Sequence, residues 1–303
     1  MHHAIIDLGT NTCNLLIAST EGKQYKILYS GKEGVKLGKE GINQNILSPE
    51  AFERAAKAIS SHLQIINRYA VDEIIAIATS AVRDAVNRDE FARYIFEKTG
   101  LSLTIISGEE EAEYIFKGVR LAFGTMGNSL ILDIGGGSNE FILTHGSTFM
   151  WRKSFPIGMS RIISRFPISD PISSDEIQAI EKYFDKELEP LWERLDNANV
   201  RRLIGCSGAF DTIADIIDNV LPDTKFRVTQ EIKLEEFNAV SEEIICSTTA
   251  QREKMSSLEP LRIEMIVPSC IFIRFILNKL SITEIIQTGF SLKEGVLYTK
   301  INY

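Results

Sequence analysis

The chain carries the same short motif twice, and this repetition restricts its fold more than any other feature of the sequence. In each copy an apolar, strand-like run ends in aspartate, with glycine two positions later and a hydroxyl residue five positions later. The copies are IIDLGTNT and ILDIGGGS, so Asp7 and Asp133 lie 126 positions apart (133 − 7). One glycine turn proves little, but two matching turns in two similar halves indicate a duplicated domain with a shared cleft.

The first half alternates predicted strands with predicted helices. Three strand-like runs fall within 4–30, and the polar, glycine-rich stretch 31–45 is predicted to be a loop. Ser48 and Pro49 predict the start of a helix, because serine caps helices and proline suits the first turn. A strand, a helix ending in glycine, a further strand and a second helix follow over 73–79, 87–100, 101–107 and 109–122.

The second half begins this order again at residue 129. Three strand-like runs are followed by a long amphipathic helix, a strand, a helix, an apolar helix, a strand and a terminal helix, over 173–195, 201–205, 208–218, 259–280, 283–288 and 292–301. The order β-β-β-α-β-α therefore occurs twice. It predicts an α/β protein built from two similar domains.

Composition and charge narrow the class of protein. The net charge of −8 argues against a general nucleic-acid binder, because duplex binding rests on a basic surface. No apolar stretch reaches the ~18–20 uninterrupted residues of a membrane helix. The start of the sequence leaves no room for a signal peptide, and the four scattered cysteines fit a reduced protein. We therefore expect a cytoplasmic protein that binds neither nucleic acid nor membranes.

The residues of the two repeated turns suit a phosphate ligand. The three glycines 135–137 exceed what a hairpin requires, and they let backbone amides approach an anion closely. Asp7 and Asp133 suit Mg²⁺, which proteins usually bind through one or two carboxylates and water. Taken alone, each turn is also explained as an ordinary hairpin in which glycine supplies positive φ. Side-chain donors are available from Thr10, Asn11, Thr12, Ser138 and Asn139.

A third glycine turn, within LIGCSGAFDTIAD over 203–215, joins a predicted strand to a helix. Ser207 and Gly208 would lie at the helix N-terminus, where backbone amides favour anions. An ordinary strand–helix turn explains the same residues equally well. Ser207 and Gly208 are therefore candidate phosphate-binding residues with a structural alternative.

Three consecutive glutamates begin the helix predicted over 109–122. Ser107 with Glu110 predicts a capping box, and acidic residues in a first turn suit the helix dipole, so helix formation alone explains the acidity. Glu111 borders the apolar stripe of this helix, whereas Glu110 faces outward. A carboxylate at the edge of a buried face can act as a general base on water, and this position slightly favours Glu111 over its neighbours.

Other chemistries lack their sequence signatures. The four histidines have no metal-ligand spacing, and neither a G-x-S-x-G elbow nor a Walker A motif is present. No dinucleotide-type G-x-G-x-x-G follows a strand. Cys13, beside the first turn, is interpreted as a small buried residue rather than a nucleophile.

The assembled motifs are similar to those of the exopolyphosphatase / guanosine-pentaphosphate phosphohydrolase family of the sugar-kinase–actin superfamily. The resemblance extends nearly end to end over IIDLGTNTCNLLIA, ATSAVRDAVNRDEF, IISGEEEAEYIFKGV, ILDIGGGSNEFIL, GCSGAFDTIA and LKEGVLY. It implies the short form of the family, with duplicated ribonuclease-H-like (actin-like ATPase) α/β domains around a central interdomain cleft. We expect domain I at 1–124, domain II at 125–290, and the terminal helix 291–303 packed back on domain I.

The resemblance implies Mg²⁺-dependent hydrolysis of a terminal phosphoanhydride bond in polyphosphate or guanosine pentaphosphate, and it is compatible with a homodimer. The family's catalytic glutamate corresponds to Glu111, which settles the choice among the three glutamates. Asp133 and Glu140 correspond to the family's carboxylates around the metal ion and the attacking water. Asp7 is expected to be a further metal ligand. The phosphate-binding positions of the family correspond to Gly9, Thr10, Asn11, Thr12, Arg83, Gly135, Gly136, Gly137 and Ser138.

Some residues depart from the family pattern, and two other functions stay open. Ala209 removes a hydroxyl from the third turn, Gly289 stands where an acidic residue is frequent, and Lys293 replaces arginine. These departures leave open a catalytically weak protein that binds polyphosphate or an alarmone as a sensor. A kinase of the same superfamily is less well supported, because such kinases resemble the chain in the phosphate loops but lack the ISGEEEA motif.

Overall fold

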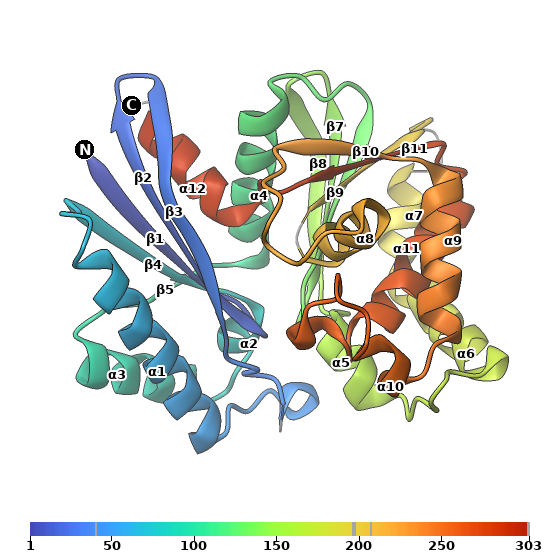
Figure 1. Cartoon of the computed structure of the whole chain (residues 1–303), viewed down its shortest axis with the longest axis horizontal. Helices are drawn as coiled ribbons and strands as arrows, with labels where there is room; N and C mark the ends of the chain where they lie inside the picture. The colour runs from blue at the N-terminus through green and yellow to red at the C-terminus, as the bar shows by residue number, and fades with distance from the viewer. Residues whose placement is uncertain (40, 196–197, 207, 302–303) are drawn as a thin grey trace. The chain divides into compact units, whose positions relative to one another are not determined.

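The computed structural model describes residues 1–39, 41–195, 198–206 and 208–301 (Figure 1). The chain forms two compact units, each with its own sheet. Unit 1 comprises Met1–Leu121, Gly135–Gly137 and the segment from Phe290 onward, whereas unit 2 comprises Ala122–Ile134 and Ser138–Gly289. The second glycine turn therefore clusters with unit 1, while the strands on either side of it belong to unit 2.

Within its described residues, unit 1 has a mixed five-stranded sheet with the order β3-β2-β1-β4-β5. Its strands are β1 His2–Leu8, β2 Thr12–Glu21, β3 Gln24–Gly34, β4 Glu73–Ala78 and β5 Thr104–Ile105. The pairs β1–β2 and β2–β3 are antiparallel, whereas β1–β4 and β4–β5 are parallel. Because β1 and β4 run in the same direction, their carboxyl ends, beside the first glycine turn, lie at one edge of the sheet.

The helical elements of unit 1 are η1 Ile42–Gln44, α1 Pro49–Ile66, α2 Ser80–Arg83, α3 Arg88–Thr99, α4 Gly108–Phe123 and α12 Leu292–Ile301. Helix α1 packs against β1, β2 and α3, and the buried residues Ala4, Ile6 and Leu8 of β1 join this core. These three alternate along the strand with buried Ile5, which therefore points to the opposite face. Helix α12 also contacts β1 and β2, so the sheet is covered by segments from both ends of the chain (Figure 1).

Helices α4 and α12 approach each other closely through two glycines. A Cβ on Gly118 would overlap the carbonyl of Ser291, and a Cβ on Gly295 would overlap the carbonyl of Tyr114. Only glycine allows backbones to come this near. The helix that begins with the three glutamates is therefore fixed to the terminal helix.

Unit 2 has a six-stranded sheet in its described residues, with the order β10-β11-β9-β6-β7-β8. Its strands are β6 Ser129–Ile134, β7 Asn139–His145, β8 Thr148–Phe155, β9 Arg202–Cys206, β10 Thr229–Ile232 and β11 Glu284–Thr288. The series β8-β7-β6-β9 has the same order and strand directions as β3-β2-β1-β4 of unit 1. The internal repeat seen in the sequence is thus a repeat of sheet topology.

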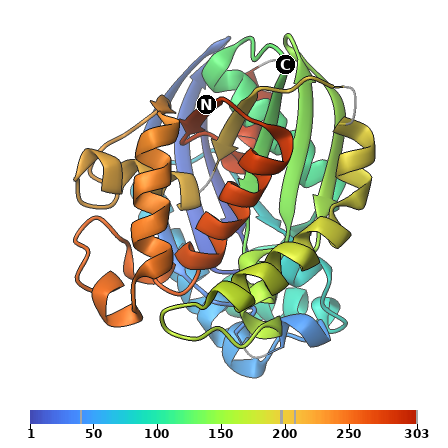
Figure 2. The same cartoon turned by 90° about the vertical axis from the view of Figure 1, so that its right-hand side faces the viewer.

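The helical elements of unit 2 are α5 Met159–Arg165, α6 Ser174–Glu187, α7 Glu189–Leu195, α8 Gly208–Asp218, α9 Leu234–Cys246, α10 Thr249–Arg252, η2 Pro260–Arg262 and α11 Ile266–Leu280. Helices α9 and α11 pack side by side, and α11 also contacts α5, α6 and α8 (Figure 2). The expected α/β class, with two mixed sheets and covering helices, is confirmed.

Several predicted helix ends are confirmed by their capping contacts. Ser48 accepts a hydrogen bond from the amide of Ala51 at 3.2 Å, with Pro49 in the first turn of α1. Ser107 and Glu110 form the predicted reciprocal capping box of α4, with distances of 2.8 and 3.2 Å. Local chemistry therefore determines where these helices begin.

Other expectations were wrong. The stretch 31–45 is not wholly a loop, because β3 extends to Gly34, and Val35 and Leu37 are buried in the core of unit 1. The single long helix expected over 173–195 is divided into α6 and α7 at Leu188. Pro190, in the first turn of α7, cannot donate the backbone hydrogen bond that a continuous helix requires. Helices α5 and α9 were not predicted, and β5 is shorter than expected.

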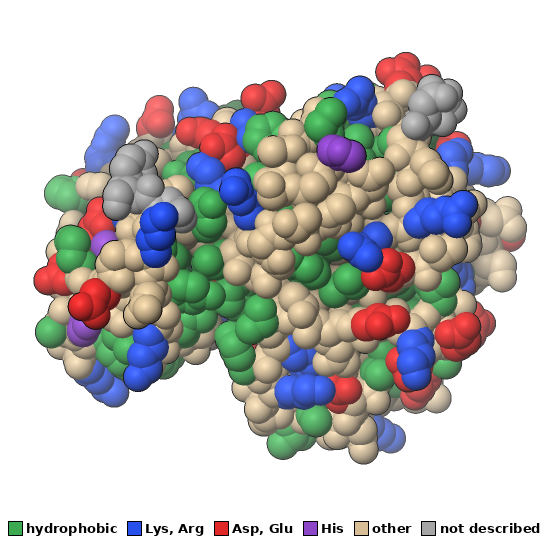
Figure 3. Space-filling view, turned by 90° about the horizontal axis from the view of Figure 1, so that it is seen from above, with side chains coloured by type: hydrophobic (Ala, Val, Ile, Leu, Met, Phe, Trp, Pro, Cys, Tyr) green, Lys and Arg blue, Asp and Glu red, His purple; other side chains and the backbone are tan. Residues whose placement is uncertain are grey.

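On the face in Figure 3, the Lys and Arg side chains of the described residues are interspersed with Asp and Glu. Among the described residues, none of the helices combines the length and apolar character needed to span a membrane.

Candidate active site

The first glycine turn connects the antiparallel strands β1 and β2 and is held by its own backbone. The Gly9 amide donates to the Thr12 carbonyl at 2.9 Å. The carbonyl of Thr10 accepts from the Leu37 amide at 2.7 Å, and that of Asn11 accepts from the Val35 amide at 2.8 Å. These contacts explain why part of the expected loop 31–45 is buried, since it packs along the turn.

The second glycine turn meets the first one inside unit 1. A Cβ on Gly137 would lie 2.5 Å from Ser80 Oγ and 2.7 Å from Thr10 Oγ1, so this position excludes any side chain. Gly137 and Thr10 were both predicted to bind phosphate, and the structure brings them together. It adds Ser80, a buried hydroxyl at the start of α2 that the sequence analysis did not single out.

Asp133 and Glu140 face each other across β6 and β7 in unit 2. They are directly paired in the antiparallel register, and their exposed fractions are only 7% and 2%. One oxygen of Glu140 accepts hydrogen bonds from Ser138 Oγ and Ser154 Oγ, each at 2.6 Å. Two adjacent buried carboxylates repel each other, so a bound cation or a proton would stabilise the pair.

The corresponding pair in unit 1 has a different chemistry. Asp7 is paired with Asn14 across β1 and β2, and the Asn14 amide donates to the Asp7 carboxylate at 2.9 Å. Both partners lie seven positions after their aspartate, as 14 − 7 and 140 − 133 show. Asn14 was missed, although the internal repeat could have identified it as the counterpart of Glu140.

Glu111 lies in the first turn of α4 and is buried, with 7% of its surface exposed. The Arg83 guanidinium, at the end of α2, donates from Nη1 to Glu111 Oε2 at 2.6 Å. Glu113, two positions later, instead pairs with Lys117 at 2.8 Å on a partly exposed face of the helix. The predicted base and the predicted phosphate ligand Arg83 are thus in direct contact, and both belong to unit 1.

The third glycine turn is described only in part, because Ser207 lies outside the described residues. A Cβ on Gly208 would overlap the guanidinium of Arg262, which therefore covers the start of α8. Ala209 is buried in the core of unit 2, where a small apolar side chain fits. Arg262 is a further cation near a predicted phosphate position that the sequence analysis missed.

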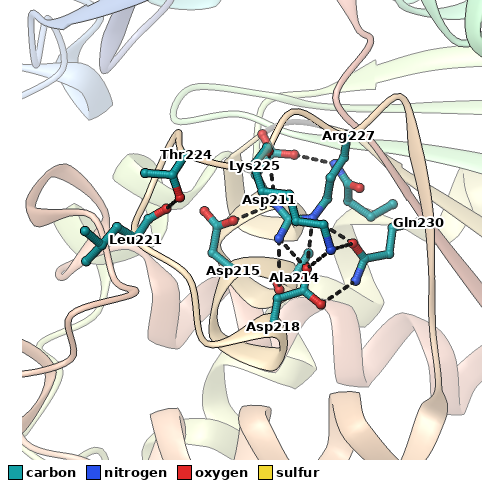
Figure 4. Close-up of polar contacts among 10 residues, drawn as sticks. Asp211, Ala214, Asp215, Asp218, Leu221, Thr224, Lys225, Arg227 and Gln230 are labelled. Atoms are coloured by element: carbon teal, nitrogen blue, oxygen red, sulfur yellow. Dashed lines mark hydrogen bonds and ion pairs between the residues drawn. The ribbon is translucent and has the colours of Figure 1, made fainter.

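An ion-pair network supports the other end of α8 (Figure 4). Arg227, of which 8% is exposed, pairs with Asp215 at 2.6 Å and also with Asp218. Burial opposes ionisation of Asp218, but hydrogen bonds from Lys225 and Arg227 outweigh it and lower the pKa of Asp218. The network fixes the segment before β10 against α8.

The same segment explains the departure at Gly289. A Cβ on Gly289 would lie 2.7 Å from the carbonyl oxygen of Arg227, too close for the acidic residue expected from the family pattern. Lys293, the other departure near the terminal helix, pairs with Glu294 at 3.0 Å. The close approach of Arg227 thus explains Gly289, whereas nothing in the structure explains lysine rather than arginine at 293.

The candidate metal ligands are Asp7, Asp133 and Glu140. In the described part of either unit, no three His, Cys, Asp or Glu side chains come together as a complete metal cage. Mg²⁺ does not need one, because it commonly binds one or two carboxylates and keeps its remaining ligands as water or phosphate oxygens. The buried Asp133–Glu140 pair fits that donor set, whereas Asp7 belongs to the other unit.

The chain is similar in sequence and in fold to several known proteins. The chain is 34% identical to an exopolyphosphatase from Cytophaga hutchinsonii of known structure, with a TM-score of 0.95, covering 100% of this chain and 98% of that one. It is 34% identical to a bifunctional 3-dehydroquinate synthase/phosphatase of Fusobacterium nucleatum over 91% of this chain and 43% of that protein. It is 27% identical to a guanosine-5'-triphosphate,3'-diphosphate pyrophosphatase of Pseudoalteromonas atlantica over 98% of this chain and 58% of that protein.

The chain thus spans about half the length of these two curated relatives. A family model described as the Ppx/GppA phosphatase family matches residues 16–303. That match includes the whole sheet of unit 2, the second and third glycine turns, Arg83 and Glu111, whereas β1 and the first glycine turn precede it. The chain belongs to the Ppx/GppA phosphatase family.

Proposed function

We propose that the chain hydrolyses the terminal phosphoanhydride bond of inorganic polyphosphate, and that guanosine pentaphosphate is an alternative substrate of the same reaction. The observation that carries the proposal is the contact between buried Glu111 and Arg83 at 2.6 Å. It joins a candidate base to a cation that suits a phosphate group. The identity of 34% to the Cytophaga hutchinsonii exopolyphosphatase supports polyphosphate as the substrate.

Glu111 is proposed to activate the attacking water. The hydrogen bond from Arg83 and the first turn of α4 hold the Glu111 carboxylate in a fixed position, from which it can accept a proton. The water oxygen bonds to the terminal phosphorus, the bridging P–O bond breaks toward the shortened chain, and the water proton passes to Glu111. General base catalysis of this kind contributes roughly 10²–10⁴-fold.

The glycine turns are proposed to bind the phosphate groups. Gly137 brings backbone without a side chain next to Thr10 Oγ1 and Ser80 Oγ, so amide and hydroxyl donors are concentrated there. Further donors are proposed from Gly9, Asn11, Thr12, Gly135, Gly136, Ser138, Ser207 and Gly208. Donors of this kind stabilise the charge that develops on the transferred group.

We propose that Asp133 and Glu140 of unit 2 hold Mg²⁺ when substrate is bound. Asp7, in unit 1, is proposed as a metal ligand on the resemblance alone. The mutual repulsion of Asp133 and Glu140 in a buried position supports a divalent cation at this pair. The ion would supply charge neutralisation for the phosphate oxygens. Ser138 and Ser154 orient Glu140 by donating to one of its oxygens.

The test is phosphate release with Mg²⁺ from long-chain polyphosphate, short polyphosphate, guanosine pentaphosphate and ATP. Wild type is compared with Glu111→Gln, which removes the base, and with Glu113→Gln, a matched change on the same helix. We expect turnover of polyphosphate or guanosine pentaphosphate, its loss in Glu111→Gln with binding retained, and normal turnover in Glu113→Gln. Tight binding without release from any substrate would instead support the sensor function, and phosphorylation of an added hydroxyl acceptor would support a kinase.

A further inference from the structure

Asp84 lies in the contact network around Glu111, although neither the repeated motif nor the glutamate triplet draws attention to it. It is the C-terminal cap of the short helix α2. Its Oδ1 lies 3.4 Å from Arg83 Nε, and its Oδ2 accepts a hydrogen bond from Ser80 Oγ at 3.4 Å. Asp84 therefore contacts both the cation that holds Glu111 and the hydroxyl beside Gly137.

The Arg83 guanidinium is held between two carboxylates. Nη1 donates to Glu111 at 2.6 Å, while Nε faces Asp84 at 3.4 Å. The guanidinium is planar and rigid, so contacts at two of its nitrogens fix its orientation as well as its position. A single contact to Glu111 would leave the group free to rotate about that hydrogen bond.

The side chains that make these contacts are largely shielded from water. The side chains of Arg83 and Glu111 are 16% and 10% exposed, and that of Asp84 is 27% exposed. Ser80 is buried, and its Oγ lies 2.5 Å from the position that a Cβ on Gly137 would take. A continuous polar path thus runs from the second glycine turn through Ser80, Asp84 and Arg83 to Glu111.

We propose that Asp84 is a positioning residue for phosphoanhydride hydrolysis, which holds Arg83 in the orientation that aims the Glu111 carboxylate at the attacking water. This inference rests on the proposed function. Asp84 itself touches neither water nor substrate in this scheme; it acts through Arg83. Misplacement of a reacting group by about 1 Å can lower the rate on the order of 10²-fold. Loss of the Asp84 contact should therefore lower the rate of hydrolysis by a measurable factor.

The position offers a variant that separates geometry from charge. In Asp84→Asn the side-chain oxygen can still accept a hydrogen bond from Arg83 Nε, so the orientation is kept while the charge is removed. In Asp84→Ala both are lost. Asp89→Ala is the matched control, since Asp89 is an exposed acid nearby that pairs loosely with Arg88 at 3.9 Å.

The experiment measures kcat and KM for phosphate release from polyphosphate with Mg²⁺, together with the thermal midpoint of each folded variant. We expect Asp84→Ala to lower kcat by roughly 10-fold to 100-fold with KM changed less than about 3-fold, and Asp84→Asn to recover most of kcat. Asp89→Ala should match wild type. Correction for the folded fraction separates this effect from a loss of stability.

Three outcomes would overturn the inference: an unchanged kcat per folded molecule in Asp84→Ala, an Asp84→Asn variant as impaired as Asp84→Ala, or an effect confined to KM. Glu111→Gln is run in parallel to judge the proposed function. Turnover by wild type that is lost in Glu111→Gln but not in Asp84→Ala rejects only the role of Asp84. Absence of turnover in wild type rejects the hydrolase itself.

Discussion

Asp133 and Glu140 are direct cross-strand partners on β6 and β7, and both carboxylates are buried. Their counterparts in the other sheet, Asp7 and Asn14, form a carboxylate–amide hydrogen bond of 2.9 Å instead. The repeat has therefore kept the geometry of the pair while changing its charge. In unit 1 the carboxylate accepts a hydrogen bond from its amide partner, whereas in unit 2 both partners are carboxylates, which is why Mg²⁺ is proposed there.

This difference predicts how the Asp133–Glu140 pair responds to substitution. Glu140→Gln should raise the Mg²⁺ concentration for half-maximal activity by about 10-fold or more, because one of the carboxylates proposed to bind the ion is lost. A Mg²⁺ titration of phosphate release measures this directly. Glu231→Gln, at an exposed position of β10, is the control. An identical Mg²⁺ dependence in Glu140→Gln and wild type would exclude the pair as the metal site.

Gly137→Ala should damage the contact between the two glycine turns. The new methyl group would lie 2.5 Å from Ser80 Oγ and 2.7 Å from Thr10 Oγ1, and overpacking of this size costs about 1–3 kcal/mol. We expect a lower thermal midpoint and reduced phosphate release. The double variant Gly137→Ala, Ser80→Gly relieves one of the two overlaps and should recover part of both. If the double variant is no better than Gly137→Ala, the overlap with Ser80 is not the cause.

Asp218 predicts a pH-dependent contribution to stability. Hydrogen bonds from Lys225 and Arg227, against the opposing effect of burial, hold the pKa of Asp218 below its ordinary value of 3.8. A lowered folded-state pKa gives stability that is present above the unfolded pKa and is lost as pH falls through the folded pKa. Asp218→Asn should therefore lower the thermal midpoint at pH 7, and the difference from wild type should shrink below about pH 4. A difference that stays constant between pH 7 and pH 3 would contradict this assignment.

The cysteines should differ sharply in reactivity. Cys13, Cys206 and Cys270 are buried, and burial raises the pKa of the Cys270 thiol to about 12 and also raises the pKa of Cys13. Cys246 is exposed on α9. Alkylation of the native protein should modify Cys246 first, as mass spectrometry of the peptides can measure, and Cys246→Ser should remove this fast phase. Rapid labelling of Cys13 in the folded protein would show that the first turn opens.

Features encoded by neighbouring residues could be predicted from the sequence. The capping of α4 and the start of α1 depend on side chains within four positions of each other, and Glu111 borders the apolar stripe of its own helix. The repeated motif predicted two similar sheets because both copies end a strand at the same offset. The resemblance, rather than spacing, singled out Arg83, and the contact of Arg83 with Glu111 appears only in the fold.

Features that depend on distant segments could not be predicted in this way. Ser80 lies against Gly137, and Arg262 lies against Gly208. Each pair is far apart in the sequence, and nothing in the residues between them indicates the contact. Val35 and Leu37 lie in a polar stretch, and their burial follows from backbone hydrogen bonds to the first turn. Pro190 was visible in the sequence, but the amphipathic pattern continues across it and conceals the break between α6 and α7.

The close approach of Gly118 to Ser291 and of Gly295 to Tyr114 has a consequence for folding. The chain leaves unit 1 near the end of α4 and, apart from the glycine turn Gly135–Gly137, returns to it only at Phe290, after unit 2. The chain between α4 and α12 thus forms one very long loop, whose ends must come together before α12 can pack on α4. Bringing the ends of a long loop together has an entropic cost. Unit 2 is continuous apart from the short glycine turn and can assemble from sequential segments, whereas unit 1 needs both ends of the chain. We therefore expect the packing of α12 on α4, the helix that carries Glu111, to be the last part of the fold to form.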